Sequence, residues 1–293
     1  PLPAIAFALQ QYPETHFQVW PPDYMVELVE RALAPWPNKT VKGLSRIQAE
    51  ADISLPAAMN KFKEGYSTLK TPLVEYAYRC LLDMDPPTAE DKNYLQPPVA
   101  TLPDRLKTAL GDQPYVVFTT NYTSRTRVFT PEVAHPIIDY VLARGHRPVF
   151  LGQKAVPVGG GATIGTSTSA IDTSRGLSLL DETTLVEAHS VLAGARAVVG
   201  VDNGLLHLAA MTDVPVVAGF TNVAASTREP HRHGAKSWRW SSVEPPKTLK
   251  CAPCQSKWHY CYNVKFTECT YGDYLCNQLN SQEFISALQN FGV

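Results

Sequence analysis

The stretch AVVGVDNGLLHLAAMTDVPVVAGFT, from Ala197 to Thr221, decides the fold of this chain. Its apolar, β-branched beginning, Ala197 to Val201, predicts a buried strand that ends at the turn Asp202-Asn203-Gly204. An apolar helical pattern follows the turn, and Val214 to Phe220 predicts a second buried strand. The ligand crevice of an open α/β sheet lies at the carboxyl ends of its strands, and a helix N-terminus offers N–H groups to an anion. We therefore predict a parallel α/β sheet with a site for a phosphorylated ligand at this turn.

A second strand–loop–helix segment lies upstream and has the same character. Tyr115 to Phe118 predicts a buried strand, and Pro131 begins a predicted helix that continues through Leu142. Hydroxyl and guanidinium groups crowd the loop between them, and Arg offers forked donors that suit phosphate oxygens. The candidate phosphate-binding residues are Thr119, Thr120, Arg125 and Arg127. The alternative interpretation is a polar loop with no special role.

Five of the six cysteines lie close together near the C-terminus. Cys251-Ala252-Pro253-Cys254 opens this cluster, and Cys269 and Cys276 close it. Two short-spaced thiol pairs are typical of tetrahedral thiolate binding of Zn²⁺ or iron, so these four cysteines are the predicted ligands of one structural metal ion. Two disulfides are an alternative that requires an oxidising compartment, and the printed chain shows no signal peptide. Reduced thiols that bind nothing are the third possibility.

Length and composition agree with an enzyme of two α/β domains. A chain of 293 residues suits two domains of ordinary size, and 44% hydrophobic residues supply their cores. No apolar run approaches the roughly 20 residues that cross a bilayer, so we expect no transmembrane segment. The net charge of −1 gives no general attraction to polyanions. The segment from Arg228 to Lys257 nevertheless carries seven Lys or Arg against two Glu. It is either a surface for an acidic acceptor or the diphosphate, or a solvated loop.

The remaining pattern divides the chain. The Pro-rich segment from Asp85 to Pro103 cannot hold a regular helix or a central strand, and we predict that it links domain 1–100 to domain 101–293. The second domain then contains the cysteine-rich module 251–276 and the terminal helix. Further predicted strands are His16–Trp20, Ala51–Leu55 and Pro148–Leu151; further predicted helices are Leu2–Tyr12, Asp23–Leu33 with Asp23 as its cap, Pro72–Asp83, Glu182–Ala193 and Ser281–Phe291, and residues 154–175 are expected to form a loop.

Asp202-Asn203-Gly204-Leu205-Leu206-His207-Leu208-Ala209-Ala210 resembles the Asp-Thr-Gly-Leu-Ser-His-Leu-Ala-Ala signature of bacterial heptosyltransferases, glycosyltransferase family nine, at seven of nine positions. Thr119-Thr120 with Arg125 or Arg127 resembles the loop that binds the donor diphosphate in that family. The Cys-Ala-Pro-Cys element resembles a cysteine finger that binds iron in some protein-modifying members, and there Cys261 competes with Cys269 for the third ligand position.

The resemblance implies a GT-B fold of two Rossmann-like domains, with the terminal helix crossing back onto the first domain. It implies a cytoplasmic glycosyltransferase, with peripheral attachment to the inner membrane as a variant. The donor would be ADP-heptose or a related nucleoside diphosphate sugar, and the acceptor a glycan, lipopolysaccharide or protein. No organic cofactor and no nucleic acid are expected. The implied donor-binding residues are Thr119, Thr120, Arg125, Arg127, Asp202, Asn203, Gly204, Leu205 and His207.

The catalytic base stays unassigned. In this family an essential acid lies in a Gly-Asp turn shortly before a Leu-Pro-Ala-Leu segment, which Leu2-Pro3-Ala4-Ile5 resembles. The expected acid would therefore lie upstream of Leu2.

Two other classes of function stay open. A degenerate GT-B chain would bind a sugar nucleotide, or act as a scaffold, without turnover. A zinc-ribbon protein would use the cysteines and the basic segment to bind nucleic acid, although that requires a basic footprint over the domain. An NAD-dependent oxidoreductase is disfavoured, because no Gly-x-Gly-x-x-Gly follows a strand.

Overall fold

The computed structural model describes most of the chain. It describes residues 2–43, 72–88, 90, 93–120, 125–153, 171–230, 239–254, 269 and 271–293. The predicted strand Ala51–Leu55, residues 154–170 of the predicted loop and Cys261 lie outside the described residues.

The C-terminal half is built on one parallel sheet of six strands. These are β3 (Tyr115–Thr119), β4 (Arg147–Gly152), β5 (Leu177–Leu180), β6 (Ala197–Val201), β7 (Val216–Gly219) and β8 (Trp240–Val243). Their spatial order is β5-β4-β3-β6-β7-β8, and every neighbouring pair is parallel. This is the order of a doubly wound dinucleotide-binding fold, in which the chain reverses its direction of progress between the two central strands. The predicted parallel α/β sheet is confirmed.

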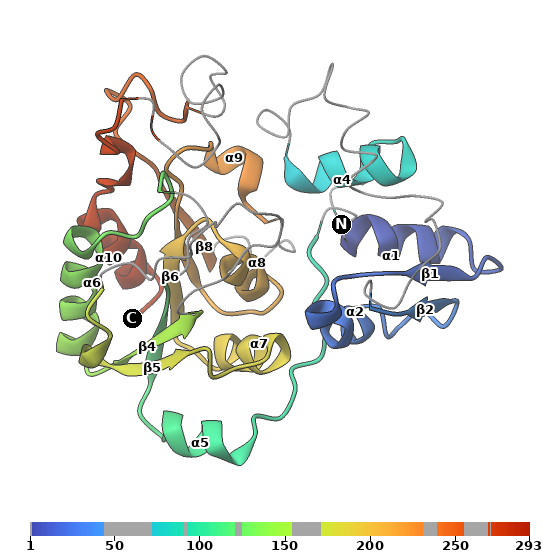
Figure 1. The fold of residues 1–293 in the computed structure, drawn as a ribbon, viewed down its shortest axis with the longest axis horizontal. Helices are drawn as coiled ribbons and strands as arrows, with labels where there is room; N and C mark the ends of the chain where they lie inside the picture. Colours follow the sequence, from blue (N-terminus) through green and yellow to red (C-terminus); the bar gives the residue numbers. More distant parts are fainter. Residues whose placement is uncertain are drawn as a thin grey trace.

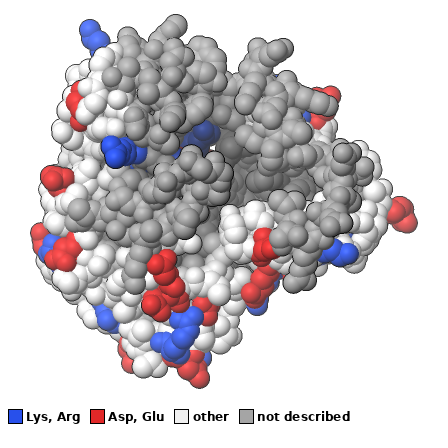
Figure 2. Space-filling model, in the orientation of Figure 1, with Lys and Arg blue, Asp and Glu red and all other residues white. Residues whose placement is uncertain are grey.

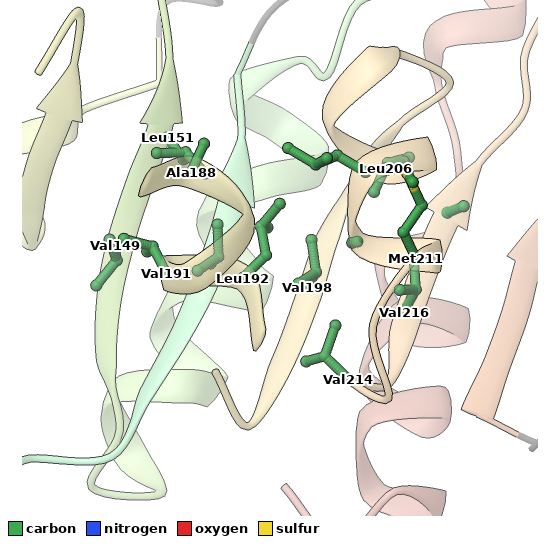
Figure 3. Close-up of a cluster of buried hydrophobic side chains, with 14 of the residues drawn as sticks. Val149, Leu151, Ala188, Val191, Leu192, Val198, Leu206, Met211, Val214 and Val216 are labelled. Carbon is green, nitrogen blue, oxygen red and sulfur yellow. The ribbon is translucent and has the colours of Figure 1, made fainter. Parts of the chain in front are cut away.

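Helices cover both faces of this sheet (Figure 1). They are α6 (Pro131–Ala143) and α10 (Ser281–Asn290) on one face, and α7 (Leu185–Ala193) and α8 (Gly204–Ala210) on the other. Side chains alternate across the strands, so Val116 packs with the first pair of helices and Val117 with the second. Figure 3 shows the cluster beneath α7 and α8, in which Val191 lies beside Val149 of the sheet and Leu192 lies beside Val198.

Within the described residues, the N-terminal half holds a small parallel sheet of two strands with helices packed beside it. Its elements are α1 (Leu2–Gln11), β1 (Phe17–Val19), the 3-10 helix η1 (Asp23–Met25), α2 (Val26–Ala32), β2 (Lys39–Val41) and α4 (Leu73–Leu82). Strands β1 and β2 pair in parallel, and α1 packs against α4 through residues such as Ala4 and Tyr78. Asp23 was expected to cap one continuous helix. That expectation is wrong, because Asp23 is the first residue of η1 and no side chain caps the N-terminus of α2.

The segment before the large sheet connects the two halves. The described residues of 85–103 form no α-helix or strand, and α5 (Asp104–Leu110) follows them. Leu2 and Leu95 each pack against both the N-terminal cluster and the cluster beneath α7 and α8. The division into two domains at residue 100 stays a prediction.

The terminal helix does not cross back onto the first half. Phe284 and Leu288 of α10 are fully buried in the cluster beneath α6, in the C-terminal half. Figure 1 shows α10 on the side of the sheet that faces away from the N-terminal half. The apolar face of α10 is therefore used within the C-terminal half, and the expected crossover is corrected.

The sequence does not predict the strands β2, β5 and β8 or the helices α5 and α9 (Ala225–Arg228). Within the parts of the chain that the structure describes, no helix is both long and apolar enough to cross a lipid bilayer. On the face drawn in Figure 2, acidic and basic side chains of the described surface are interspersed.

Candidate functional site

The central strands β3 and β6 end side by side at the point where the sheet reverses its winding. Thr119 is the last residue of β3 and pairs with Gly200 in β6. Asp202 follows the end of β6 directly. Ligands of doubly wound folds bind at this switch point, so the topology brings together the two loops that the sequence singles out separately.

The contact between these strand ends is tight. A Cβ atom on Gly200 would fall 1.9 Å from Oγ1 of Thr119, so only glycine fits opposite this hydroxyl. Asn203 Nδ2 donates a hydrogen bond of 3.0 Å to Thr119 Oγ1. Asn203 Oδ1 accepts from the backbone N–H groups of Leu205 and Leu206, at 3.0 and 3.1 Å. Asn203 is therefore the N-cap of α8 and fixes the loop to β3.

A buried carboxylate occupies the centre of the site. Asp202 is 5% exposed. One of its carboxylate oxygens faces Arg127 and the other faces His207. Arg127 Nη1 lies 3.2 Å from Oδ2, and His207 Nε2 lies 3.4 Å from Oδ1. Because Arg127 comes from the loop after β3, this ion pair joins the two predicted phosphate-binding loops.

The pKa of Asp202 reflects these neighbours. Burial opposes its ionisation, but the His207 hydrogen bond and the charges of His207, Arg127 and Arg228 together lower the pKa to about 2. The group is therefore a carboxylate throughout the neutral range. It orients cationic side chains and is too weak a base to remove a proton from an acceptor hydroxyl.

Two residues belong to this cluster that the sequence did not assign to it. The Tyr94 hydroxyl lies 3.1 Å from Nδ1 of His207, and the two rings stack with centroids 6.0 Å apart. Burial and the nearby Asp202 charge raise the pKa of Tyr94. Arg228 is also close to this group: burial and Arg127 lower the pKa of its guanidinium, while Asp202 raises it. Tyr94 lies in the Pro-rich linker without any motif, whereas Arg228 begins the basic segment that the sequence did identify.

The other predicted donor-binding residues differ in their surroundings. Thr120 is 2% exposed, and its Oγ1 finds no hydrogen-bond partner among the described residues. Arg125 is exposed. Gly204 is exposed at the first position of α8, and a Cβ there would meet open space. The Leu205 amide, expected to serve an anion, is engaged by the Asn203 cap.

The four predicted metal ligands lie around one small cavity of about 10 Å³, close to the space of a single water molecule or ion. The lining residues are Cys251, Cys254, Cys269, Cys276, Thr126, Ala252, Tyr271, Asp273 and Leu275. No disulfide joins two of the described cysteines. Across the described parts of the chain, no three side chains of the types His, Cys, Asp or Glu are grouped so that they could hold a metal ion. The thiols therefore share a cavity without converging on one point.

A larger cavity of about 290 Å³ lies between β8 and α10. Its polar lining is made of neutral side chains and Glu283, and it contains none of the residues that the sequence singles out. It is therefore a poor match for a diphosphate, and the charge cluster at the switch point is the better candidate.

Residues 72–257 match the model of a protein family described as glycosyltransferase family 9 (heptosyltransferase). A search among curated protein sequences gave no match. Among solved structures, the ADP-heptose lipopolysaccharide heptosyltransferase II of E. coli is 15% identical, with a TM-score of 0.58 over 100% of this chain and 95% of that one.

The iron-containing dodecameric glycosyltransferase TibC of enterotoxigenic E. coli H10407 is also similar in structure. It is 14% identical, with a TM-score of 0.63 over 99% of this chain and 74% of its own. TibC in complex with ADP-D-beta-D-heptose matches 95% of this chain and 76% of its own, with a TM-score of 0.60 and 14% identity. At such identities the likeness concerns the fold, and it confirms the expected fold of parallel-sheet heptosyltransferases.

Proposed function

Because the chain belongs to glycosyltransferase family 9, and is therefore a glycosyltransferase, we propose that it transfers a sugar from a nucleoside diphosphate donor to an acceptor hydroxyl. The proposed donor is ADP-heptose or a related ADP-sugar. The proposed acceptor is a hydroxyl of a glycan, a lipopolysaccharide or a protein.

The observation that carries this proposal is the buried Asp202 with Arg127 at the switch point of the sheet. Arg228 adds a second guanidinium to the same cluster. Two guanidinium groups beside one carboxylate leave a local excess of positive charge, which suits the two phosphates of a nucleotide sugar. Asp202 holds Arg127 in orientation, so the fork of donors is preorganised before the ligand arrives.

The donor assignment has support from one structural neighbour, because TibC is described in complex with ADP-D-beta-D-heptose. We propose that Thr119, Thr120 and the arginines contact the diphosphate. Asp202 and Asn203 would lie near sugar or ribose hydroxyls. Gly204 leaves room for a close approach of the ligand to the start of α8.

The proposed reaction is a direct displacement at the anomeric carbon. The acceptor oxygen forms a bond to this carbon, the bond to the diphosphate oxygen breaks, and the nucleoside diphosphate leaves with the electron pair. A base takes the acceptor proton; no described residue is proposed for this role, and the low pKa of Asp202 disfavours it. The arginines stabilise the charge that develops on the leaving diphosphate.

We further propose that Cys251, Cys254, Cys269 and Cys276 hold one structural Zn or Fe ion. The support is their common cavity and their soft thiolate chemistry, together with the iron-containing neighbour TibC. The four thiols share this cavity without converging on one point, so binding of the ion would have to draw them together. Four thiolate ligands leave no open coordination position, so such an ion would organise the element rather than take part in transfer. Reduced thiols would also agree with the proposed cytoplasmic location.

The test is calorimetric titration of the protein with ADP and ADP-heptose, followed by a transfer assay. Arg127→Ala and Arg228→Ala are each expected to weaken ADP binding by about 10- to 100-fold, since each removes charged hydrogen bonds to phosphate. Arg105→Ala is the matched control, because Arg105 forms an exposed ion pair with Glu187 away from this site. Wild-type affinity in both variants would remove the cluster from the donor site. ADP-heptose binding without transfer to any acceptor would favour the non-catalytic alternative.

A further inference from the structure

The loop that carries Arg127 is held by a side chain from the far C-terminal end of the chain. Asn277 lies in the 3-10 helix η8 (Leu275–Asn277) and is 5% exposed. Its Nδ2 donates a hydrogen bond of 2.7 Å to the carbonyl of Arg125, and its Oδ1 accepts from the N–H of Val128 at 3.4 Å. One carboxamide thus bridges the backbone on both sides of Arg127.

The residue between these contacts, Thr126, is held as well. Its carbonyl accepts a hydrogen bond of 2.5 Å from Thr221 Oγ1, and Cys276 Sγ approaches the same carbonyl at 3.9 Å. Its hydroxyl accepts from Asn222 Nδ2 at 2.7 Å. Thr126 and Asn222 are both almost fully buried. The backbone before Arg127 is therefore fixed from two sides, by the loop after β7 and by the cysteine-rich element.

The cysteine cavity is part of the same arrangement. Thr126 lines that cavity beside Cys254 and Cys276, and Cys254 Sγ lies 3.9 Å from the carbonyl of Asn222. Thr126 consequently contacts the cysteine cavity and precedes the arginine that pairs with Asp202 at 3.2 Å. Thr126 is the single residue between the cysteine cavity and Arg127. A change in the packing of the cysteines would therefore shift the backbone that carries Arg127.

We propose that Cys276 and Asn277, at the edge of the cysteine cavity, position Arg127 for the donor diphosphate, with Asn277 as the positioning residue. This inference rests on the proposed function, in which Arg127 binds the diphosphate. Asn277 matches the position chemically, because a carboxamide supplies the one donor and the one acceptor that the two flanking peptide groups need. Aspartate lacks the donor and would set a carboxylate against the Arg125 carbonyl.

The energetic reason is preorganisation. Arg127 is 27% exposed, and the backbone that carries it gains conformational freedom when the Asn277 clamp is removed. Binding must then order the loop again, and the cost appears as lost affinity. Asn277 itself does not reach the ligand in this arrangement, so its effect requires Arg127.

The test is a double-mutant cycle on the affinity for ADP, measured by calorimetry. Asn277→Ala is expected to weaken ADP binding by about five- to tenfold in the wild-type background. In the Arg127→Ala background the same change is expected to add less than about twofold. Asn277→Asp, which preserves volume, serves as the second variant if Asn277→Ala folds poorly. In the transfer assay the KM for the donor should rise, while the KM for the acceptor stays unchanged.

Asn280→Ala is the matched control. Asn280 caps α10 by accepting a hydrogen bond of 3.0 Å from Gln282 N, in the same C-terminal segment. Its loss lowers stability without touching residues 125–128, so ADP affinity should stay at the wild-type value. The bound metal of Asn277→Ala, measured by elemental analysis, should also equal that of the wild type.

The outcomes separate the two proposals. Equal losses from Asn277→Ala with and without Arg127 would overturn the positioning role, as would wild-type affinity in both Asn277 variants. If Arg127→Ala itself binds ADP like the wild type, the proposed donor site is wrong.

Discussion

The hydroxyl of Tyr94 lies 3.1 Å from Nδ1 of His207, and the rings of these two residues are stacked with an interplanar angle of 27°. The other ring nitrogen of His207 faces Asp202 at 3.4 Å. A carboxylate only accepts hydrogen bonds, so a neutral His207 must carry its proton on Nε2. Nδ1 is then an acceptor, and the Tyr94 hydroxyl donates to it. Asp202 thereby selects the tautomer of His207, and Tyr94 of the linker supplies the hydrogen bond that Nδ1 of this tautomer accepts.

Tyr94→Phe tests this relationship. The ring stacking survives the change while the hydrogen bond to His207 is lost, so ADP affinity is expected to fall by about two- to fivefold. Calorimetric titration at neutral pH measures the loss, and the unfolding transition checks that the fold persists. Wild-type affinity in Tyr94→Phe would show that the His207 ring is held without this bond.

The low pKa of Asp202 predicts an acid-dependent loss of stability. Its folded pKa of about 2 lies below its ordinary value of 3.8, so its contribution is present above about pH 4 and is lost as the pH falls through about 2. This contribution is about 2 kcal/mol. Urea unfolding should show that the stability difference between wild type and Asp202→Asn shrinks by this amount from pH 5 to pH 2. Asp112→Asn, at an exposed position, controls for the loss of one negative charge. A difference that is constant with pH would contradict the assignment.

Gly200→Ala is expected to destabilise the protein by about 1–3 kcal/mol. The reason is that the added Cβ would fall 1.9 Å from Oγ1 of Thr119, at the paired position of the neighbouring strand. Thr119→Ala removes this hydroxyl, so the double variant should regain part of the stability. Thermal unfolding of the two single variants and the double variant gives the coupling. If the stability losses of the two single variants simply add in the double variant, the alanine at position 200 is accommodated by separation of strands β3 and β6, and the Thr119 hydroxyl is not the cause of the clash.

Gly204→Ala distinguishes an effect on the stability of the fold from an effect on the binding of the ligand. Gly204 is the first residue of α8 and faces open space, and alanine is the better helix former. The unfolding temperature should therefore stay the same or rise, while ADP affinity falls if the donor approaches this backbone. Unchanged ADP affinity would place the donor elsewhere along the loop.

The cysteine-rich element should contain about one Zn or Fe per chain. Elemental analysis of the purified protein measures the metal, and thiol counting under denaturing conditions measures the reduced cysteines. Cys276→Ser should lower the metal content, whereas Cys80→Ser should leave it unchanged, because Cys80 lies in α4 and does not line the cavity. Two disulfides without metal would overturn this prediction and indicate an oxidising compartment.

The sequence by itself determined the local elements around the site. Apolar β-branched runs predicted β3 and β6, and the predicted helix from Pro131 corresponds closely to α6, because a buried strand and an amphipathic helix each have their own residue period. Short polar or mixed segments carry no such period. The sequence therefore missed β2, β5, β8, α5 and α9. It also started α7 at Glu182 instead of Leu185, where the Thr184–Glu187 capping box begins the helix.

Only the tertiary structure decided which of these parts meet. Strand order brings the hydroxyl of Thr119 to within 3.0 Å of the carboxamide of Asn203, which lies 84 positions further along the chain. It also brings Tyr94 of the linker to His207, and Asn277 of the C-terminal segment to the Arg127 loop. Such contacts depend on packing between distant segments, which leaves no pattern in the local sequence. The same reason explains the correction of α10: the family resemblance implied a crossover onto the first domain, whereas the buried residues of α10 pack against α6 of the same half.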